Sequence, residues 1–421
     1  MEKTKKIGLK LSWAFYDWAN SAWSAMIITF VFSRYFVDVL SSNPHIGTLY
    51  WTWTIGISSL VAALMSPIFG SMSDQSQKSK NWLIITTLIY SIICFLFWFT
   101  HPINGLNIFI LLLFIFIGNL SYEISQIFYN GQLKVIAVEE NYAKISGLSW
   151  GLGYIGTVII FISYYAIFLL PEGNVLNLNK ENYEHIRISF PITGLWILIF
   201  SIPLFITFKE KKQNILNNYL NFKDSLKQII FTLKNISRYK NLLWFLISRL
   251  FYMDGINAIF AVAAIYATIV FGMDTSDIIL LGIGTNLAAG IGSWVFSFIE
   301  KNLGSKNVIV LSLSIIFVIS TIILFINVKI QFIILAIILS SFFGPIQSAS
   351  RVYFAKNIPN EKKYEFFGFY SFSGKVTAFI GPVMYGTVSY IFKSPKMGMA
   401  SLLILFLIGL IILLKVKNDK Q

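Results

Sequence analysis

The chain is poor in charged residues, which make up 12% of its 421 positions. A soluble domain usually has about a quarter. Apolar residues supply 56% of the sequence and aromatic residues 17%. Long apolar runs with so few charges exclude an ordinary soluble protein and predict an integral membrane protein, with the lipid bilayer as its surroundings.

Cysteine and histidine are also scarce. Cys94 is the single cysteine and lies in an apolar run, so the sequence offers no disulfide and no cysteine metal site. The three histidines (His45, His101 and His185) fall outside the long apolar runs, and no nucleotide-binding loop is present. We therefore expect no enzymatic activity, no metal and no cofactor.

The net charge of +14 raises the question of a nucleic-acid partner. The positive residues lie between apolar runs and form no separate basic domain, so we expect no nucleic-acid binding. Such residues are instead typical signals of membrane topology.

Twelve apolar stretches are long enough to cross a bilayer as helices. They cover residues 12–37, 50–72, 82–100, 105–130, 146–170, 188–208, 242–271, 278–299, 307–326, 330–354, 366–392 and 397–415. The first has a basic start like that of a signal peptide, but its apolar run is too long and no small-residue cleavage site follows. We expect it to remain as a true span.

The positive residues alternate between the two sides of these spans. With the N-terminus in the cytoplasm, the cytoplasmic segments carry 24 Lys and Arg residues and the outer loops carry 5. The positive-inside rule then places both termini in the cytoplasm. Lysine predominates and Ile and Asn are abundant, which favours a bacterial protein in the inner membrane.

The longest loop, residues 209–241, divides the spans into two sets of six. It predicts an N-terminal half (1–208), a cytoplasmic linker and a C-terminal half (242–421). Apolar residues in the linker recur at helical spacing among lysines, which favours an interfacial amphipathic helix over the alternative of a solvated linker. These apolar residues are Phe222, Leu226, Ile229, Ile230, Leu233 and Ile236.

The two halves repeat one phrase. Asp17 and Asn20 in the first span match Asp254 and Asn257 in the seventh, each pair three residues apart on one helix face. A carboxylate is costly inside a membrane, so such residues are usually functional. We interpret the faces as binding substrate or protons; the alternative is that the aspartates cap or brace helix ends, and Asp17 could lie near the cytoplasmic surface.

Further echoes support a duplicated architecture. Gln126 and Gly147 match Gln347 and Gly368 at a single offset. Two parallel halves of six helices are the plan of major facilitator transporters. We therefore predict an all-α membrane protein with twelve transmembrane helices in two pseudo-symmetric halves.

A polar stripe follows the fourth span at spacings of three and four residues, through Glu123, Gln126 and Asn130. The tenth span contributes Gln347 and Arg351, which we add to the candidate binding or coupling residues. Polar faces of this kind must point away from lipid.

Lys375 lies deep in the eleventh span, where it needs an acidic partner, and Asp254 and Glu123 are the candidates. A lysine and a carboxylate around a cavity could hold the two ends of a zwitterion. The alternative is a structural ion pair that holds one conformation shut.

The loop after the second span resembles the major facilitator loop signature. Gly70, Asp74, Lys78 and Lys80 match it, whereas Gln77 stands where the signature has glycine. The resemblance implies a gating loop that latches the halves on the cytoplasmic side, and Gln77 puts its tight turn in doubt.

The segment 16–22, Tyr-Asp-Trp-Ala-Asn-Ser-Ala, resembles the signature of one branch of that superfamily. Further matches lie at 146–154, 254–257, 344–351 and 365–375. The branch includes the fungal autophagy-related vacuolar effluxers and bacterial permeases. The resemblance implies a secondary transporter, and the fungal members are described as exporting neutral amino acids.

We expect a monomeric transporter that moves a small-molecule substrate by alternating access, with neutral amino acids as the best candidate and export as the direction. Protons remain an open choice of coupling ion, with Asp254 or Glu123 as carrier. Alternative readings are a different cargo (a sugar, nucleoside, drug-like molecule or lipid) or a membrane sensor that uses the fold without transport.

Overall fold

The computed structural model describes residues 2–102, 105–169, 178–210 and 222–418, and the regular structure in these residues is entirely helical. Eleven helical segments there are long and apolar enough to cross a membrane. They are Ile7–Leu40, Pro44–Ser76, Ser79–Phe99, Ile108–Ile136, Glu139–Phe168, Glu184–Thr207, Ser237–Phe271, Ser276–Leu303, Ser305–Phe325, Lys329–Asn357 and Pro395–Leu414. The remaining predicted span, 366–392, is present as two shorter helices, so the all-α architecture is confirmed.

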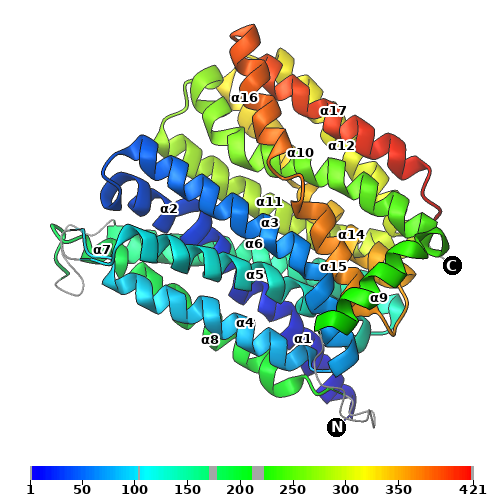
Figure 1. Ribbon diagram of the computed structural model, residues 1–421. Coiled ribbons are helices and arrows are strands. Elements are labelled where there is room, and N and C mark those ends of the chain that lie inside the picture. Colours follow the sequence, from blue (N-terminus) through cyan, green and yellow to red (C-terminus); the bar gives the residue numbers. More distant parts are fainter. Residues whose placement is uncertain (1, 103–104, 170–177, 211–221, 419–421) are drawn as a thin grey trace. The chain divides into compact units, whose positions relative to one another are not determined.

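The first six spans follow one another along the blue to green part of the ribbon (Figure 1). They contain α1 (Glu2–Ala22), η1 (Trp23–Phe30), α2 (Phe32–Tyr35), η2 (Phe36–Leu40), α3 (Pro44–Ser76), α4 (Ser79–Leu96), η3 (Phe97–Phe99), α5 (Ile108–Ile136), η4 (Glu139–Asn141), α6 (Tyr142–Tyr164), η5 (Tyr165–Leu169), α7 (Glu184–Arg187) and α8 (Ser189–Thr207). Of these, η1, η2 and η5 are π-helical, and η3 and η4 are 3₁₀ turns.

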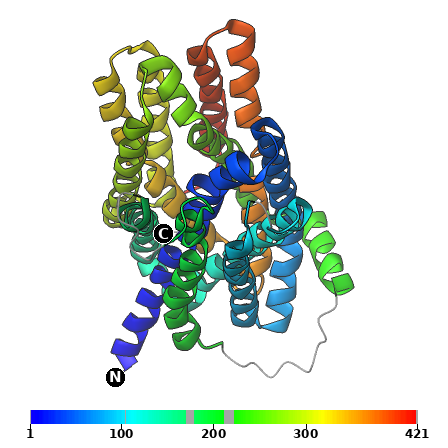
Figure 2. The same ribbon diagram turned by 90° about the vertical axis from the view of Figure 1, so that its left-hand side faces the viewer.

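The rest of the chain begins with a short helix in the predicted linker and continues with the other six spans. It contains α9 (Phe222–Lys234), η6 (Ile236–Tyr239), α10 (Lys240–Phe271), α11 (Thr275–Leu303), α12 (Ser305–Phe325), α13 (Lys329–Ser340), α14 (Phe343–Asn357), α15 (Lys363–Lys375), α16 (Ile380–Phe392) and α17 (Pro395–Leu414). Figure 2 shows α16 and α17 side by side, in orange and red.

Packing divides the chain into two compact units. Unit 1 comprises Met1–Ala62, Ser76–Tyr129 and Leu152–Asn217, and unit 2 comprises Ala63–Gln75, Asn130–Gly151 and Asn218–Gln421. Helices α3, α5 and α6 therefore contribute residues to both units. We call the ends of the spans that adjoin residues 209–241 the linker side.

Aromatic residues form the core of unit 1. Phe32 stacks on Phe97 with ring centroids 4.0 Å apart, and Phe190 packs edge-on against Phe32 at 4.9 Å. Large rings bury 150–250 Å² each and so dominate the packing of such a core. This cluster surrounds η1 and α2, where the first span departs from α-helical geometry.

Close helix contacts in unit 2 depend on small residues. Helix α10 packs against α17, where a Cβ added to Gly409 would lie 3.1 Å from Tyr252. Ser248 donates a 2.6 Å hydrogen bond to the carbonyl of Gly409 at the same contact. Small residues and interhelical hydrogen bonds are the usual means by which membrane helices associate.

Prolines interrupt two spans of unit 2. Proline lacks an N–H and its ring clashes with the carbonyl four residues earlier. Pro345 accordingly follows the break at residues 341–342 between α13 and α14, and Pro382 follows the break at 376–379 between α15 and α16. The break before Pro382 divides the predicted eleventh span into the short helices α15 and α16, and the break before Pro345 separates α13 from α14 in the tenth.

Helix α9 confirms that residues 222–234 of the linker are helical. Residues 211–221 lie outside the described residues. Ser225, Ile229 and Thr232 are buried, so only one of the predicted apolar positions points inward. Most of the others are exposed, among them Phe222, Ile230 and Leu233.

Candidate functional site

The Asp-x-x-Asn phrase of unit 1 lies on one buried face of α1. The Asp17 side chain is 9% exposed and the Asn20 side chain 4%, and Asn20 Nδ2 donates to Asp17 Oδ1 at 3.5 Å. Gly153 of α6 lies against this turn, since a Cβ there would come within 3.5 Å of the Asp17 Cβ. Asp17 is thus enclosed by helices, and whether it binds substrate or braces the helix stays a prediction.

Two turns beyond Asp17, the helix widens into the π-helix η1. Thr29 Oγ1 donates to the carbonyl of Ser24, five residues earlier, at 2.9 Å. π-helical turns are rare and occur often at functional sites. Sequence reasoning did not foresee this feature, because a π-turn has no residue signature comparable to that of proline.

The polar stripe of α5 is buried within unit 1 at Asn119 and Glu123, and Gln126 is half-buried. Glu123 is 5% exposed, and Gln126 Nε2 donates to Ser125 Oγ at 3.4 Å. Asn119, one turn earlier, donates to Ser58 Oγ of α3 at 2.8 Å. The stripe therefore faces protein, as a polar face in a membrane helix must.

In unit 2 the matching phrase adjoins the break of the eleventh span. Asp254 is 2% exposed, and its Oδ1 has no hydrogen-bond partner among the described residues. Asn257 Nδ2 donates to the carbonyl of Gly374, at the end of α15, at 3.4 Å. Discontinuous helices that expose free backbone groups are typical of binding sites in secondary transporters.

The backbone of Gly381, in the first turn of α16, lies beside Asp254. A Cβ at Gly381 would lie 2.6 Å from the Cβ of Ala258 and 3.5 Å from Asp254 Oδ1, so only glycine fits there. A carboxylate near a helix N-terminus is stabilised by the orphan N–H groups and the helix dipole. The first turn of α16 therefore lies directly beside the Asp254 carboxylate.

Asp254 and Glu123 are the candidate acidic partners of Lys375, and of the two only Asp254 belongs to the same unit as Lys375. Lys375 is the last residue of α15 and is partly buried, whereas the Asp254 carboxylate faces Gly381 of α16. The two charges nevertheless lie on packed elements, because Asn257 of α10 is bonded to Gly374, the neighbour of Lys375.

Arg249 is a buried charge of unit 2 that is not among the candidate residues predicted from the sequence. Its Nη1 donates to the carbonyl of Tyr370 at 2.7 Å and to Ser373 Oγ at 3.0 Å. The guanidinium carbon lies 3.6 Å from the centroid of the Tyr370 ring, a cation–π contact. Arg249 therefore fixes α15 against α10 one turn before the break.

Arg351 and Asn130 meet in a brace on the linker side of unit 2. Arg351 is 1% exposed; its Nη1 donates to Asn130 Oδ1 at 3.2 Å, its Nε to Ser146 Oγ at 2.9 Å and its Nη2 to the Ser146 carbonyl at 2.9 Å. Gln347, one turn earlier, donates to the carbonyl of Phe343 at 3.2 Å. Arg351 thus joins α14 to the linker-side parts of α5 and α6.

Two of the predicted gating-loop residues, Gly70 and Asp74 of α3, contact the start of α15. Asp74 accepts the backbone N–H of Tyr364 at 3.2 Å through Oδ1 and that of Glu365 at 2.8 Å through Oδ2. Gly70 makes room for this contact, since a Cβ there would lie 2.1 Å from the Tyr364 carbonyl oxygen. Asp74 therefore caps α15 as an acidic group caps a helix N-terminus.

The rest of the loop turns into α4. Gln77 has a φ of +52°, in the left-handed region that favours glycine, so the tight turn forms without the glycine of the signature. Lys78 is exposed ahead of α4, and the backbone N–H of Lys80 donates to Glu210 Oε1 at 2.7 Å. The lysine side chains carry no contact that fixes the turn.

Two further residues on the linker side of unit 2 escaped sequence reasoning. Lys134 Nζ donates to the carbonyls of Ala355 and Ile358 at 2.8 and 2.7 Å, and so caps the C-terminus of α14. The fully buried Glu365 accepts a 2.5 Å hydrogen bond from Gln228 of α9. We call Asp74, Lys134, Arg351 and Glu365, with their partners, the latch of unit 2.

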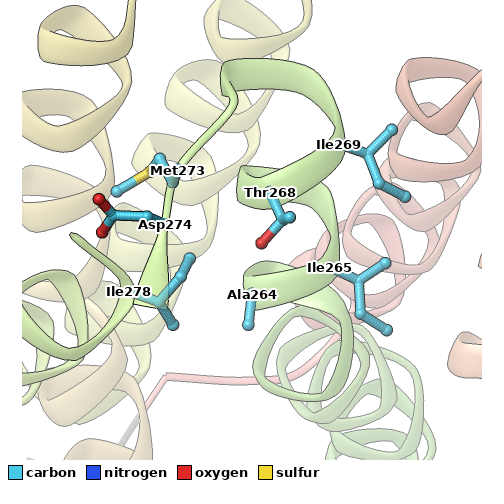
Figure 3. A pocket seen from close by; sticks show the side chains of 7 residues that line it. All are labelled: Ala264, Ile265, Thr268, Ile269, Met273, Asp274 and Ile278. Carbon is cyan, nitrogen blue, oxygen red and sulfur yellow. The ribbon is translucent and has the colours of Figure 1, made fainter. Parts of the chain in front are cut away.

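A groove of about 560 Å³ follows the far end of α10 (Figure 3). Its lining residues are Ala264, Ile265, Thr268, Ile269, Met273, Asp274 and Ile278. On a helical projection Ala264 and Thr268 share the face of Asn257. Two small residues of the groove therefore lie on the same side of α10 as Asn257, while the rest of its lining is mainly large and apolar.

Comparison with known proteins identifies the family. A family model described as "Vacuole effluxer Atg22 like" matches residues 46–141 and 134–421. The uncharacterized MFS-type transporter YxiO of Bacillus subtilis is 28% identical over 418 residues, which cover 97% of this chain and 94% of the relative. Autophagy-related protein 22 of Kluyveromyces lactis is 21% identical over 392 residues, which cover 85% of this chain and 75% of the relative.

Solved structures show the same fold. The proton:xylose symporter XylE has a TM-score of 0.76 at 14% identity, over 99% of this chain and 97% of XylE. FucP in the outward conformation has a TM-score of 0.72 at 17% identity, over 97% of this chain and 98% of FucP. The predicted major facilitator fold is therefore confirmed, and the chain belongs to the Atg22-like vacuole effluxer family of major facilitator transporters.

Proposed function

We propose that this transporter moves small neutral amino acids. The observation that carries the proposal is the buried carboxylate of Asp254, whose Oδ1 lacks a partner among the described residues beside the broken eleventh span. An unpaired carboxylate in a membrane is costly unless a cation meets it for part of the cycle. The ammonium group of an amino acid is such a cation.

The carboxylate of the same solute needs a positive group or helix N-terminus nearby. Lys375 at the end of α15 supplies the charge, and Asn257 adds an amide on the same face of α10. The resemblance to the fungal effluxers supports the same substrate class. A neutral amino acid, with one charge of each sign and a small side chain, suits this set of groups better than a sugar.

Alternating access requires that one end of the path close while the other opens. The latch of unit 2 holds the linker-side ends of α3, α5 and α6 against α14 and α15 through the bonds of Asp74, Lys134 and Arg351. We infer that these bonds within unit 2 break when the linker side opens during the transport cycle.

The excess of 24 over 5 positive residues supports a cytoplasmic linker side, with both termini in the cytoplasm of a bacterial cell and the spans in its inner membrane. The family description as an effluxer supports export. We propose a monomer as the working unit, because each chain has its own pair of six-helix halves.

Proton coupling follows if Asp254 or Glu123 exchanges a proton during the cycle. Both are buried carboxylates on polar faces, at 2% and 5% exposure. The test is uphill transport under an imposed pH gradient by the variants Asp254→Asn and Glu123→Gln. Full uphill transport by both variants would exclude either residue as the proton carrier.

The substrate class is tested by thermal unfolding of the purified protein with twenty amino acids, common sugars, nucleosides and organic acids. A ligand that binds only the folded state stabilises it by about 2.7 kcal/mol at a hundredfold excess over Kd. We expect a shift with a few neutral amino acids, absent in Lys375→Gln and retained in the control Lys393→Gln. A shift with sugars or nucleosides alone would contradict the proposal.

A further inference from the structure

Helix α9 has the reverse of the usual arrangement of a surface helix. Its inward face carries Ser225, Gln228 and Thr232 with the single apolar residue Ile229, whereas its other large apolar residues point outward or are half-buried. Phe222 is 47% exposed, Ile230 50%, Phe231 57% and Leu233 48%. Phe222, Ile230 and Leu233 lie on one side of this 13-residue helix, and their exposure there is a surface that water does not favour.

The inward face holds α9 at the level where the spans end. Gln228 donates to Glu365 Oε2 at 2.5 Å and accepts from Gln75 Nε2 at 3.0 Å. Gln75 is the penultimate residue of α3, and Glu365 lies in the first turn of α15. Because both contacts are at span ends, α9 lies near the boundary between the bilayer core and its headgroups.

Positive charge borders the apolar surface. At 100° per residue, Phe222, Leu233, Leu226 and Ile230 form one strip of α9, and Lys223, Lys234 and Lys227 form the adjacent strip. Residues 222–241 contain five Lys or Arg and one Asp. Lys362 adds a further cation, with its Nζ 5.6 Å from the centre of the Phe231 ring.

We propose that α9 is a docking element for an anionic lipid surface. Its apolar strip enters the boundary of the acyl chains, and its lysine strip meets acidic phospholipid headgroups. A wide apolar face flanked by lysines is the pattern of helices that lie in the membrane interface. A bilayer is already within reach of α9, whereas a soluble partner would have to cover an apolar surface at membrane level.

The docking has a consequence for the latch of unit 2. Gln228 bonds both to α3, through Gln75, and to Glu365, whose backbone N–H is held by Asp74. Lipid that fixes α9 therefore supports the bonds that close the linker side. This inference is independent of the substrate, since none of these residues is a candidate ligand for the amino acid.

The experiment places an environment-sensitive fluorophore on Ile230→Cys in a Cys94→Ser background. The full-length protein is reconstituted in vesicles of phosphatidylcholine alone or with one quarter phosphatidylglycerol, with and without brominated acyl chains. We expect blue-shifted emission and bromine quenching in the phosphatidylglycerol vesicles, weakened at 0.5 M salt. Each lysine near an anionic surface strengthens membrane binding about fivefold. Removing three lysines should therefore weaken the binding of α9 to the vesicle surface by roughly a hundredfold.

The triple variant Lys223→Gln, Lys227→Gln and Lys234→Gln tests that loss. Its matched control is Lys301→Gln, Lys393→Gln and Lys417→Gln, which removes three exposed lysines away from α9. Gel filtration checks that both variants are folded. The proposal is overturned if the probe remains in water in both vesicle types, the result expected if α9 binds a protein partner. It is also overturned if bromine quenching is the same in neutral and anionic vesicles and does not change when the α9 lysines are removed.

Discussion

At the scale of single residues, the backbone is strained at Gln77, where the major facilitator loop signature has glycine. Gln77 adopts a φ of +52° in the turn between α3 and α4. A side chain in the left-handed region costs roughly 1–2 kcal/mol. The turn therefore depends on its surroundings, among which is the pair of bonds from Ser79 Oγ and the Lys80 N–H to Glu210.

The variant Gln77→Gly should raise the free energy of unfolding by about 0.5–1 kcal/mol, because glycine adopts this φ without steric cost but loses more entropy on folding. Thermal unfolding in detergent measures the change. Ser76→Gly, at the last residue of α3, should lower stability by a similar amount. Equal losses in the two variants would show that Gln77 is not strained.

A second residue-scale prediction concerns the contact between α10 and α16. In Gly381→Ala the new methyl group would lie 2.6 Å from the Cβ of Ala258, which is closer than such atoms approach. Overpacking of this kind costs typically 1–3 kcal/mol. We expect a lower unfolding temperature and weaker binding at Asp254.

Gly386→Ala in the same helix is the control, since a Cβ at Gly386 would meet nothing within 4 Å. Alanine is the better helix former, so this variant should be neutral or slightly stabilising. If Gly381→Ala behaved like Gly386→Ala in both assays, the close packing of α16 on Asp254 would be wrong.

At the scale of elements, the linker-side ends of α3 and α15 are joined by one acidic side chain. Asp74 satisfies two backbone N–H groups of α15 that have no partner within the helix. Loss of such a cap costs about 0.5–2 kcal/mol. Asp74→Ala should therefore favour the state open on the linker side by roughly two- to thirtyfold.

The population of that state can be followed with a single cysteine at Ser73, which is fully buried and whose hydroxyl has no partner among the described residues. In Ser73→Cys with Cys94→Ser, maleimide labelling should become faster when Asp74→Ala is added. Asp38→Ala, which removes only an exposed ion pair with Arg34, should leave the rate unchanged. An unchanged rate in Asp74→Ala would mean that the latch does not limit opening.

The sequence was informative about elements wherever a pattern had a single physical cause. Apolar length predicted the spans, and the chemistry of proline explains the breaks before Pro345 and Pro382. The i, i+3 spacing gave the shared face of Asp17 and Asn20. The π-helix η1 and the inverted face of α9 were not predictable, because each depends on packing against distant segments.

At the scale of the whole molecule, the repeated phrases predicted the fold, and the family model and the solved structures confirm it. Pairing between distant side chains was harder to foresee. Lys375 was matched to Asp254 by charge alone, yet the Asp254 carboxylate faces the backbone of Gly381. Arg351 was a candidate ligand, but its donors are occupied by Asn130 and Ser146. A single sequence does not contain the distances between side chains on different helices.

The central claim is that Asp254 binds the ammonium group of a transported neutral amino acid. Its most direct test is counterflow in proteoliposomes loaded with one unlabelled neutral amino acid and supplied outside with a labelled trace. We predict transient accumulation in the wild type and in Lys393→Gln, and at least a tenfold slower rate in Asp254→Asn. Accumulation at the wild-type rate in Asp254→Asn, or counterflow by sugars and not by amino acids, would contradict the account.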